Sequence, residues 1–320
     1  MTVALKERIA GGIAGLVVGD ALGVPVEFVP REQLRKKPVR GMTGYGTHQQ
    51  PAGTWSDDSS MALATAESLL NGYDPVDVMK RFQDWLTNGS MTPHGRVFDI
   101  GFTTQNAIRR AGAGIPAISC GGTDETENGN GSLMRILPLS IYVHRLETDE
   151  IIEKSFEISG LTHAHVRSKL CCAYFSLVVR GILNGNELKN AMKAASHEIG
   201  PKIPPDEELD FQPIIDCSVL DRAEGQISSS GYVMHTLQAA LWCCEHHADF
   251  KSAVLAAVNL GGDSDTTGAV AGGLAGIMHG IGAIPSEWIN QLAKRDEVLK
   301  VASDFSSLMG VQNEHGSFAG

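Results

Sequence analysis

The chain has 320 residues, of which 42% are hydrophobic and 20% charged, a composition typical of a folded globular protein. Its formal net charge of -11 at pH 7 argues against a general nucleic-acid-binding protein, because the overall field repels polyanions. The six cysteines include no C-x-x-C spacing, so a zinc ribbon or a disulfide framework is not indicated, and we expect reduced, buried thiols in a cytoplasmic protein.

Apolar residues recur at helical spacing from Leu5 through Ile9 and Ile13, which predicts a first helix. Charged residues at 6–8 interrupt its start, so the N-terminus lacks the order of a signal peptide and predicts no export. One face of this helix carries a glycine at every fourth position, namely Gly11, Gly15, Gly19 and Gly23. Because an interior glycine costs roughly 1 kcal/mol relative to alanine, we expect this face to pack closely against another helix.

Two acidic residues follow in the stretch GDALGVPVEF, residues 19–28. A carboxylate near a helix C-terminus opposes the helix dipole and is usually solvated, which is our expectation for Asp20. Glu27 lies between Val26 and Phe28, and apolar surroundings raise the pKa of a carboxyl, so Glu27 is a candidate general acid or base. The five cationic residues of REQLRKKPVR, residues 31–40, predict a solvated surface, with a phosphate or an acidic protein surface as the alternative partner.

The stretch GTWSDDSS, residues 53–60, places Asp57 and Asp58 side by side, directly before an apolar run at 61–70. Serine and aspartate are favoured at helix N-termini, where a side-chain oxygen accepts a hydrogen bond from a free backbone N–H group. This position therefore predicts the start of a helix.

Helical periodicity continues along the rest of the chain, clearest at 78–86 and 170–178. Glycine and proline punctuate the intervening segments, which predicts loops at 38–53, 112–131 and 200–213. Because no run of alternating apolar and polar residues occurs, we predict an all-α, compact multi-helix fold. We expect a single domain over residues 1–310 and a loose C-terminal tail over residues 311–320.

A second acidic stretch, GGDSDTTG at 261–268, again stands directly before an apolar segment. The segment 268–284 is short for a bilayer crossing of about 20 residues and contains glycines and a histidine, so it predicts a buried helix and no membrane association. Its glycines also recur every fourth residue, at Gly268, Gly272, Gly276 and Gly280. The two glycine-striped helices should therefore lie at the centre of the fold.

Each acidic stretch taken alone is explained by helix capping, but a cap needs only one acceptor. Together Asp57, Asp58, Asp263 and Asp265 supply four carboxylates. If the two helix starts meet, each close pair costs about 4 kcal/mol at an effective dielectric constant near 20, so protons or cations must compensate. Carboxylate and hydroxyl oxygens favour hard cations such as Mg²⁺, Mn²⁺ or Ca²⁺ over Zn²⁺, and we expect two Mg²⁺ or Mn²⁺ ions.

Five stretches in this order resemble the ADP-ribosylglycohydrolases, the family that includes the dinitrogenase reductase-activating glycohydrolase: GDALGVPVEF, GTWSDDSSMA, NGNGSLMR, THAH and GGDSDTTGAVAGGLAG. The resemblance spans roughly residues 10–290 and implies an all-α fold with a central binuclear metal site. It implies as metal ligands Ser56, Asp57, Asp58, Asp263, Asp265 and Thr266.

The resemblance also implies a substrate pocket. NGNGSLMR would offer backbone N–H groups to the pyrophosphate or ribose through Asn128, Gly129, Asn130, Gly131 and Ser132, although Asn-Gly is first a turn signal. His163 and Tyr232 would line the pocket, with ordinary helix packing an equal alternative for Tyr232. Asp99 would face a guanidinium leaving group, which a carboxylate pairs through two hydrogen bonds.

The resemblance implies hydrolysis of the glycosidic bond between ADP-ribose and an acceptor, with an ADP-ribosyl-arginine protein as the first choice and an ADP-ribose-containing small molecule as another. Asp58 or Glu27 would take the proton from water. Two alternatives remain open from the residues: a two-metal phosphoester or pyrophosphate hydrolase, and a non-catalytic protein that binds ADP-ribose. The acceptor residue and the choice between Mg²⁺ and Mn²⁺ also stay open.

Overall fold

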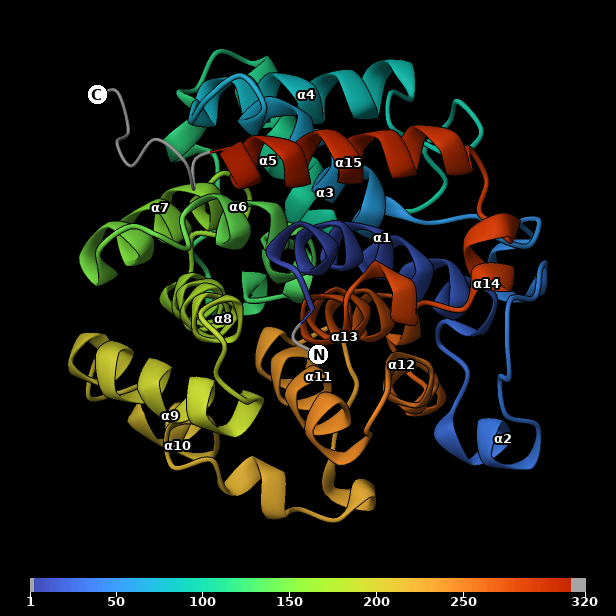
Figure 1. Ribbon diagram of the computed structural model, residues 1–320. Coiled ribbons are helices and arrows are strands. Elements are labelled where there is room, and N and C mark those ends of the chain that lie inside the picture. The colour runs from blue at the N-terminus through green and yellow to red at the C-terminus, as the bar shows by residue number, and fades with distance from the viewer. Residues whose placement is uncertain (1–2, 312–320) are drawn as a thin grey trace.

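The computed structural model describes residues 3–311, which fold almost entirely into helices (Figure 1). Its α-helices are α1 (Leu5–Gly23), α2 (Arg31–Lys36), α3 (Asp57–Leu69), α4 (Pro75–Asn88), α5 (Phe102–Gly112), α6 (Leu137–Tyr142), α7 (Thr148–Gly160), α8 (Val166–Leu183), α9 (Leu188–Ile199), α10 (Glu208–Ile215), α11 (Val233–His246), α12 (Phe250–Asn259), α13 (Ser264–His279), α14 (Ser286–Gln291) and α15 (Arg295–Val311). Within this part of the chain β-pairing is limited to isolated bridges. The predicted all-α class is confirmed.

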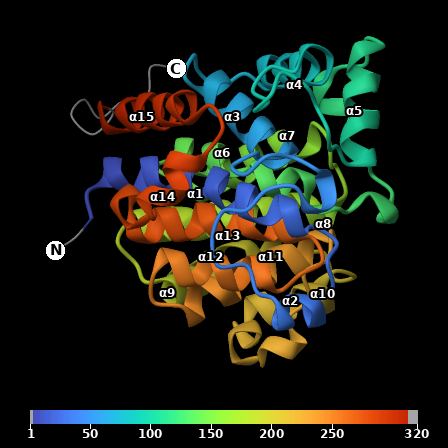
Figure 2. The same ribbon diagram turned by 90° about the vertical axis from the view of Figure 1, so that its right-hand side faces the viewer.

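Helices α1 and α13 lie side by side at the centre of the molecule (Figures 1 and 2). Their glycine faces meet backbone to backbone: a Cβ atom added to Gly19 would lie 1.9 Å from the carbonyl oxygen of Gly268, and one added to Gly15 would lie 2.4 Å from that of Gly272. The close packing predicted from the glycine spacing is therefore confirmed. A β-carbon at Gly23 would lie 2.3 Å from Asp265 Cα, so the pair is antiparallel and the end of α1 meets the start of α13.

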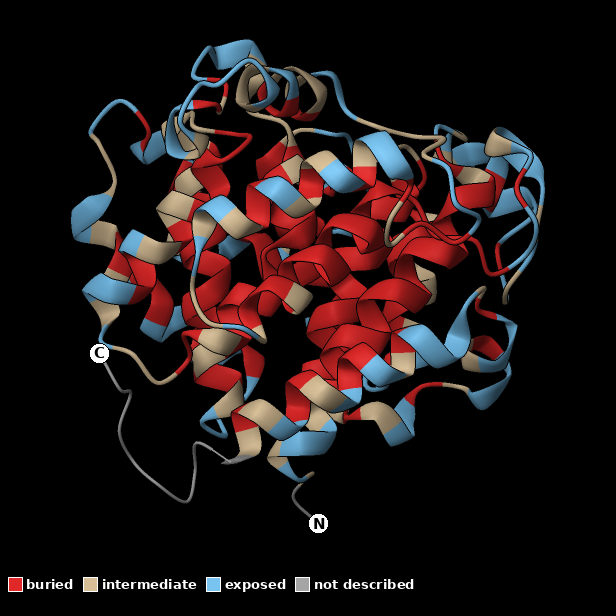
Figure 3. Cartoon of the chain, turned by 90° about the horizontal axis from the view of Figure 1, so that it is seen from above, coloured by how far each residue is buried: buried red, intermediate tan, exposed pale blue. Residues whose placement is uncertain are grey.

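The other helices enclose this pair in layers. Helices α3 and α15 pack on the α1 side, and α11 and α12 pack against α13 (Figure 1). Seen from above, the central helices are buried and the exposed residues lie on the periphery (Figure 3). In the described part of the chain, the segment Leu5–Val26 is apolar and long enough to cross a membrane by composition alone, but 94% of its most apolar window is buried within the fold. Helix α1 is thus a core helix here.

The later part of the chain contains a short helix where a loop is predicted. The loop predicted at 200–213 is wrong from residue 208 onward, where α10 begins, because Phe211 and Ile214 are buried and hold this short helix against its neighbours. The predicted C-terminal tail lies outside the described residues except for Val311, the last residue of α15. All six cysteines are free and buried, as expected.

The glycine contact can be tested with Gly19→Ala. The added methyl group would collide with the Gly268 carbonyl, which cannot move without shifting α13, so we expect a loss of about 2 kcal/mol or more in the free energy of unfolding despite the better helix propensity of alanine. Urea unfolding measures the change. As a control, Gly282→Ala adds a methyl group with no atom of the described residues within 4 Å and should change stability by less than about 0.5 kcal/mol. A Gly19→Ala protein as stable as this control would contradict the packing argument.

Candidate metal centre and adjoining pocket

The start of α3 is fixed by a carboxylate from α1. Asp20 accepts hydrogen bonds from the backbone N–H groups of Ser56 (3.0 Å) and Ser59 (3.0 Å) and from the Ser59 hydroxyl (2.5 Å). These bonds satisfy N–H groups that a helix start leaves free. Asp20 is completely buried, so the expectation of a solvated residue is wrong. Burial raises its pKa to about 6 although these hydrogen bonds oppose the shift.

The two predicted helix starts meet in the interior. Ser56 is the N-cap of α3, and its hydroxyl donates to Asp58 Oδ2 at 2.8 Å. The same oxygen accepts a hydrogen bond from the Thr266 hydroxyl of α13 at 3.3 Å. The other oxygen of this carboxylate, Asp58 Oδ1, is buried and has no hydrogen-bond partner among the described residues.

Asp263 precedes α13 but does not cap it through its side chain. Its Oδ2 atom accepts a hydrogen bond from Asn130 Nδ2 at 2.8 Å, whereas its Oδ1 atom is buried without a partner in the described structure. Gly262 has φ +67, and a side chain there would also meet the carbonyl oxygen of Ser229 at 2.4 Å, so this turn requires glycine. The turn therefore directs Asp263 toward the cluster rather than toward the helix that follows.

Asp265 connects two groups of carboxylates. Ligand atoms of Asp265, Asp20 and Asp58 lie within 4.8 Å of one another, and so do those of Asp265, Asp263 and Glu27. Burial raises the pKa of Asp265 well above its ordinary value, and the neighbouring carboxylates add to the shift. Burial, with a smaller contribution from neighbouring carboxylates, also raises the pKa values of Asp57 and Asp58.

This arrangement fits divalent cations. Its donors are carboxylate and hydroxyl oxygens, the ligands that Mg²⁺ and Mn²⁺ prefer. Two of its buried oxygens, on Asp58 and Asp263, have no partner within residues 3–311, and a buried oxygen left unpaired costs about 1–3 kcal/mol or more when charged. Cations would satisfy both oxygens and offset the repulsion between the carboxylates, which adds to the effect of burial on their pKa values.

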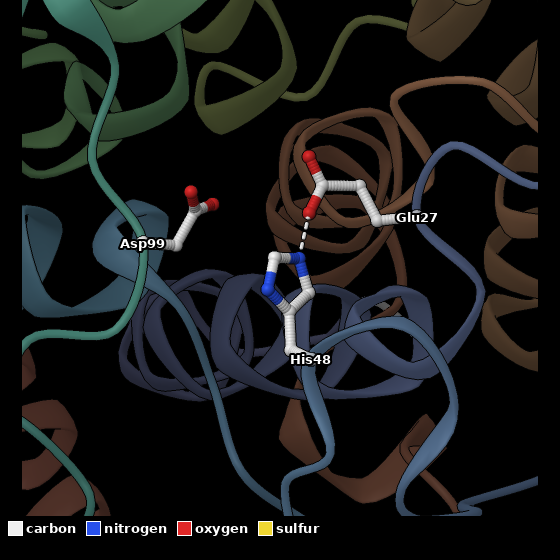
Figure 4. A group of neighbouring side chains, drawn as sticks. All are labelled: Glu27, His48 and Asp99. Carbon is white, nitrogen blue, oxygen red and sulfur yellow. Dashed lines mark hydrogen bonds and ion pairs between the residues drawn. The ribbon is translucent and has the colours of Figure 1, made fainter.

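Next to this cluster lies a second group, Glu27, His48 and Asp99 (Figure 4). His48 Nε2 contacts Glu27 Oε2, and its ring lies 5.4 Å from that of Phe98 between centroids. Burial, followed by the charge of Asp99, raises the pKa of Glu27 to about 9. His48 was not expected from the sequence, because it stands in a loop outside every motif. No sequence signal marks it.

Backbone pairing holds Glu27 beside the cluster. The Phe28 N–H group donates to the Gly262 carbonyl at 2.6 Å, and the Gly262 N–H group donates to the Val29 carbonyl at 3.0 Å. Thus the segment after α1 is tied to the turn before α13. Asp99 comes from the segment before α5, and burial raises its pKa while His48 opposes the shift.

The glycine-rich stretch 128–132 lies against the start of α11. The Val233 N–H group donates to the Asn128 carbonyl (3.2 Å), the Asn130 N–H group donates to the Gly231 carbonyl (3.0 Å), and Gly129 pairs with Tyr232. The structure therefore brings the predicted loop and Tyr232 together. The carboxyamide of Asn130 also donates to Thr236 Oγ1 at 2.9 Å, so it is engaged by two protein partners.

The remaining predicted pocket residues differ in their surroundings. Ser132 is buried, and its hydroxyl accepts hydrogen bonds from Ser159 and Cys172, so its side chain faces the core. His163 lies next to Gly131, with 3% of its surface exposed. Tyr232 is half-buried, and the Arg167 guanidinium carbon lies 5.7 Å from its ring centroid.

The basic stretch 31–40 is only partly a solvated surface. Arg31 donates to the backbone carbonyls of Leu260 (2.8 Å) and Glu224 (2.8 Å), so the expectation of a solvated side chain is wrong for Arg31. The guanidinium of Arg35 pairs with Glu224 at the surface. Arg31 therefore helps to hold α2 against the turn that leads into α13.

Comparison with known proteins gives consistent matches. Residues 1–315 match the model of the ADP-ribosylglycohydrolase family. The ADP-ribosylarginine hydrolase Tri1 of Pseudomonas putida (strain GB-1) is 32% identical over 304 residues, which cover 93% of this chain and 77% of that protein. The ADP-ribosyl-dinitrogen reductase glycohydrolase of Rhodospirillum rubrum is 32% identical over 302 residues, 92% of each chain. A solved structure described as an ADP-ribosylglycohydrolase-related protein complex matches with a TM-score of 0.80 and 33% identity, covering 95% of this chain and 99% of that one.

The raised pKa values predict how stability depends on pH when cations are removed. Carboxyls ionise near pH 4 in the unfolded chain, whereas the buried ones keep their protons to a higher pH in the folded protein. The folded state then binds more protons, so the free energy of unfolding falls as pH rises. We expect chelator-treated protein to lose stability between about pH 5 and pH 8 in urea unfolding.

The matched variant is Asp265→Asn, which removes one buried carboxylate while keeping its shape. It should lose about 1 kcal/mol less stability than the parent chain over the same pH range, and added Mg²⁺ should stabilise it less at the higher pH. Equal losses in the two proteins would show that the cluster does not carry the repulsion described above.

Proposed function

Because the chain belongs to the ADP-ribosylglycohydrolase family, we propose that it hydrolyses the N-glycosidic bond between ADP-ribose and an arginine side chain of a modified protein. Relatives named ADP-ribosylarginine hydrolase share 32% identity in Pseudomonas putida and 30% in Serratia proteamaculans. The observation that carries the proposal is the position of the buried Glu27 carboxyl and the half-buried Asp99 carboxyl beside a cluster that fits cations. A cationic guanidinium would complement Asp99 there.

The cluster would hold two Mg²⁺ or Mn²⁺ ions. We assign Asp57, Asp58, Asp263 and Asp265 as ligands, with the hydroxyls of Ser56 and Thr266 completing the set. The unpartnered oxygens of Asp58 and Asp263 support this assignment. When bound, such cations act as Lewis acids that orient ribose hydroxyls and make water more acidic.

We assign the transfer of the water proton to Glu27 rather than to Asp58. Asp58 Oδ2 already accepts hydrogen bonds from two hydroxyls, and this carboxylate lies inside the cluster. Glu27 stands at the edge of the cluster and contacts His48, which connects it toward Asp99. A carboxyl whose pKa is about 9 before cations bind holds a proton at neutral pH, and cation binding beside it would favour release of that proton.

The rest of ADP-ribose would lie along residues 128–132 with His163 and Tyr232. The amide group of Asn130 donates to Asp263 and Thr236. We therefore propose that its side chain orients Asp263 and that the backbone makes the phosphate contacts. For Ser132 the backbone is likewise the part that would meet the substrate, because its hydroxyl faces the core.

We also propose that the reaction takes place in the cytoplasm on an ADP-ribosylated protein. Six free, buried thiols support a reducing compartment. The Rhodospirillum rubrum relative is named for action on ADP-ribosylated dinitrogen reductase, which supports a protein as the carrier of the modification.

Removal of single ligands tests the reaction. Asp57→Asn and Asp265→Asn should each lower ADP-ribose release from ADP-ribosylarginine by at least about 100-fold with Mg²⁺ or Mn²⁺ present, because the cations lose a ligand. Asp149→Asn is the control, since this side chain is 81% exposed and forms an ion pair with Lys202. Release of AMP or phosphate instead of intact ADP-ribose, or full activity of either variant in chelator, would overturn the proposal.

The arginine preference has its own test in Asp99→Asn. Loss of a charge-assisted pair should reduce kcat/KM for ADP-ribosylarginine about 10- to 100-fold. The inhibition constant of free ADP-ribose, which lacks the guanidinium group, should change by less than about threefold, because this ligand makes no contact with Asp99 through a guanidinium. If inhibition weakens as much as turnover, Asp99 serves the shape of the site rather than the leaving group.

A further inference from the structure

Arg135 is a completely buried cation in the 3-10 helix that follows the glycine-rich stretch, Asn130–Arg135. Its Nη2 atom donates to the Thr162 hydroxyl oxygen (2.8 Å) and the Ile158 carbonyl (3.1 Å), while Nε and Nη1 have no partner among the described residues. The Phe82 ring centroid lies 4.7 Å from the guanidinium carbon. Burying a charge without an opposite charge costs several kcal/mol, so filling space in the core does not explain an arginine here.

The contacts of Arg135 determine which ring nitrogen of His163 carries the hydrogen. A guanidinium can only donate hydrogen bonds, so Thr162 Oγ1 must accept from it. The other partner of Thr162 Oγ1 is His163 Nδ1 at 2.9 Å. If Nδ1 carried a hydrogen, Thr162 would accept twice and leave its own buried O–H group without an acceptor, which costs about 1–3 kcal/mol. The threonine hydrogen therefore points to Nδ1.

His163 consequently carries its hydrogen on Nε2. Burial, with a smaller contribution from the Arg135 charge, lowers the pKa of His163 to about 3, so the ring is neutral and has one N–H group. Burial lowers the pKa of Arg135 to about 10, so the guanidinium stays charged at neutral pH and remains a donor. The hydrogen bonds therefore run in one direction: Arg135 donates to Thr162, and Thr162 donates to His163.

The Nε2 edge of His163 faces the glycine-rich stretch. A Cβ atom added to Gly131 would lie 2.7 Å from His163 Cε1 and 3.2 Å from Nε2, and one added to Gly129 would lie 3.7 Å from Nε2. Side chains at these positions would crowd or cover this edge. Asn130, between the two glycines, donates to Asp263, so the same stretch borders the acidic cluster.

We propose that Arg135 and Thr162 are positioning residues that fix His163 as a neutral Nε2–H donor for an acceptor oxygen of ADP-ribose. The ligand in this statement rests on the proposed function, whereas the proton arrangement rests only on the contacts of the protein. The relay joins two stretches that are separate in the sequence, because Arg135 ends NGNGSLMR and Thr162 begins THAH.

The proton arrangement is read directly by two-bond ¹⁵N–¹H correlation spectra of the full chain labelled with ¹⁵N-histidine, with Mg²⁺ and without substrate. His163→Gln identifies the signals of this ring by their disappearance. We expect the wild-type ring to be neutral with its hydrogen on Nε2. A hydrogen on Nδ1, or a protonated ring at neutral pH, would overturn the relay whether or not the chain hydrolyses ADP-ribosylarginine.

A matched pair of variants tests the link. Thr162→Val keeps the shape but removes the hydroxyl, and should give a mixture of tautomers or the Nδ1–H form, while Thr162→Ser should keep the wild-type signals. In calorimetry with ADP-ribose, Thr162→Val should bind about 10-fold more weakly, as expected for one hydrogen bond, and Thr162→Ser within about twofold of wild type. For turnover the change should fall on KM rather than kcat.

The outcomes separate the two proposals. An unchanged tautomer and affinity in Thr162→Val would refute the positioning roles. An Nε2–H ring in a protein that releases no ADP-ribose from ADP-ribosylarginine would leave the relay intact and refute the proposed function.

Discussion

The contact between the glycine faces of α1 and α13 determines where the acidic cluster forms. Because these helices touch through their backbones and run antiparallel, the C-terminal end of α1 can only lie beside the N-terminal end of α13. Asp20 on α1 then reaches the start of α3 and accepts its free N–H groups. Three helix ends therefore meet in one buried place, and the carboxylates that they carry lie close together. Close packing of the least bulky residue thus creates the most strongly charged part of the interior.

The buried charged residues differ in their hydrogen-bond partners, and these partners indicate different roles. Asp20 is satisfied by backbone and hydroxyl donors, so it holds the structure together. Asp58 and Asp263 each keep one oxygen without a partner in the described part of the chain, which is the property of a ligand rather than of a helix cap. Glu27 and Asp99 stand at the edge with His48, where a cationic leaving group would be complementary. On the far side of the glycine-rich stretch, Arg135 places a positive charge that directs a histidine proton instead of pairing with a carboxylate.

Much of this arrangement can be predicted from the sequence. The rest cannot, for physical reasons that differ from residue to residue. Glycines four residues apart and acidic residues at two helix starts are local patterns. They predict the contact of α1 with α13 and the meeting of the two helix starts, where Asp265 lies near both Asp58 and Asp263. Asp20 was misjudged because a residue near a helix C-terminus gives no sign that another helix begins against it. His48 and Arg135 depend on neighbours about 20 to 30 positions away in the chain, and no local pattern records such a contact. For the same reason the core-facing hydroxyl of Ser132 could not be foreseen.

We propose that two helix starts, distant in sequence, jointly hold divalent cations. Calorimetric titration of the cation-free protein with Mn²⁺ tests it most directly when it is repeated on Asp58→Asn from α3 and Asp263→Asn from the turn before α13. We expect stoichiometric binding to the parent chain and a loss of affinity of at least about 10-fold in both variants, because each removes one of the unpartnered oxygens. No binding to the parent chain, or binding that survives both substitutions unchanged, would contradict this proposal.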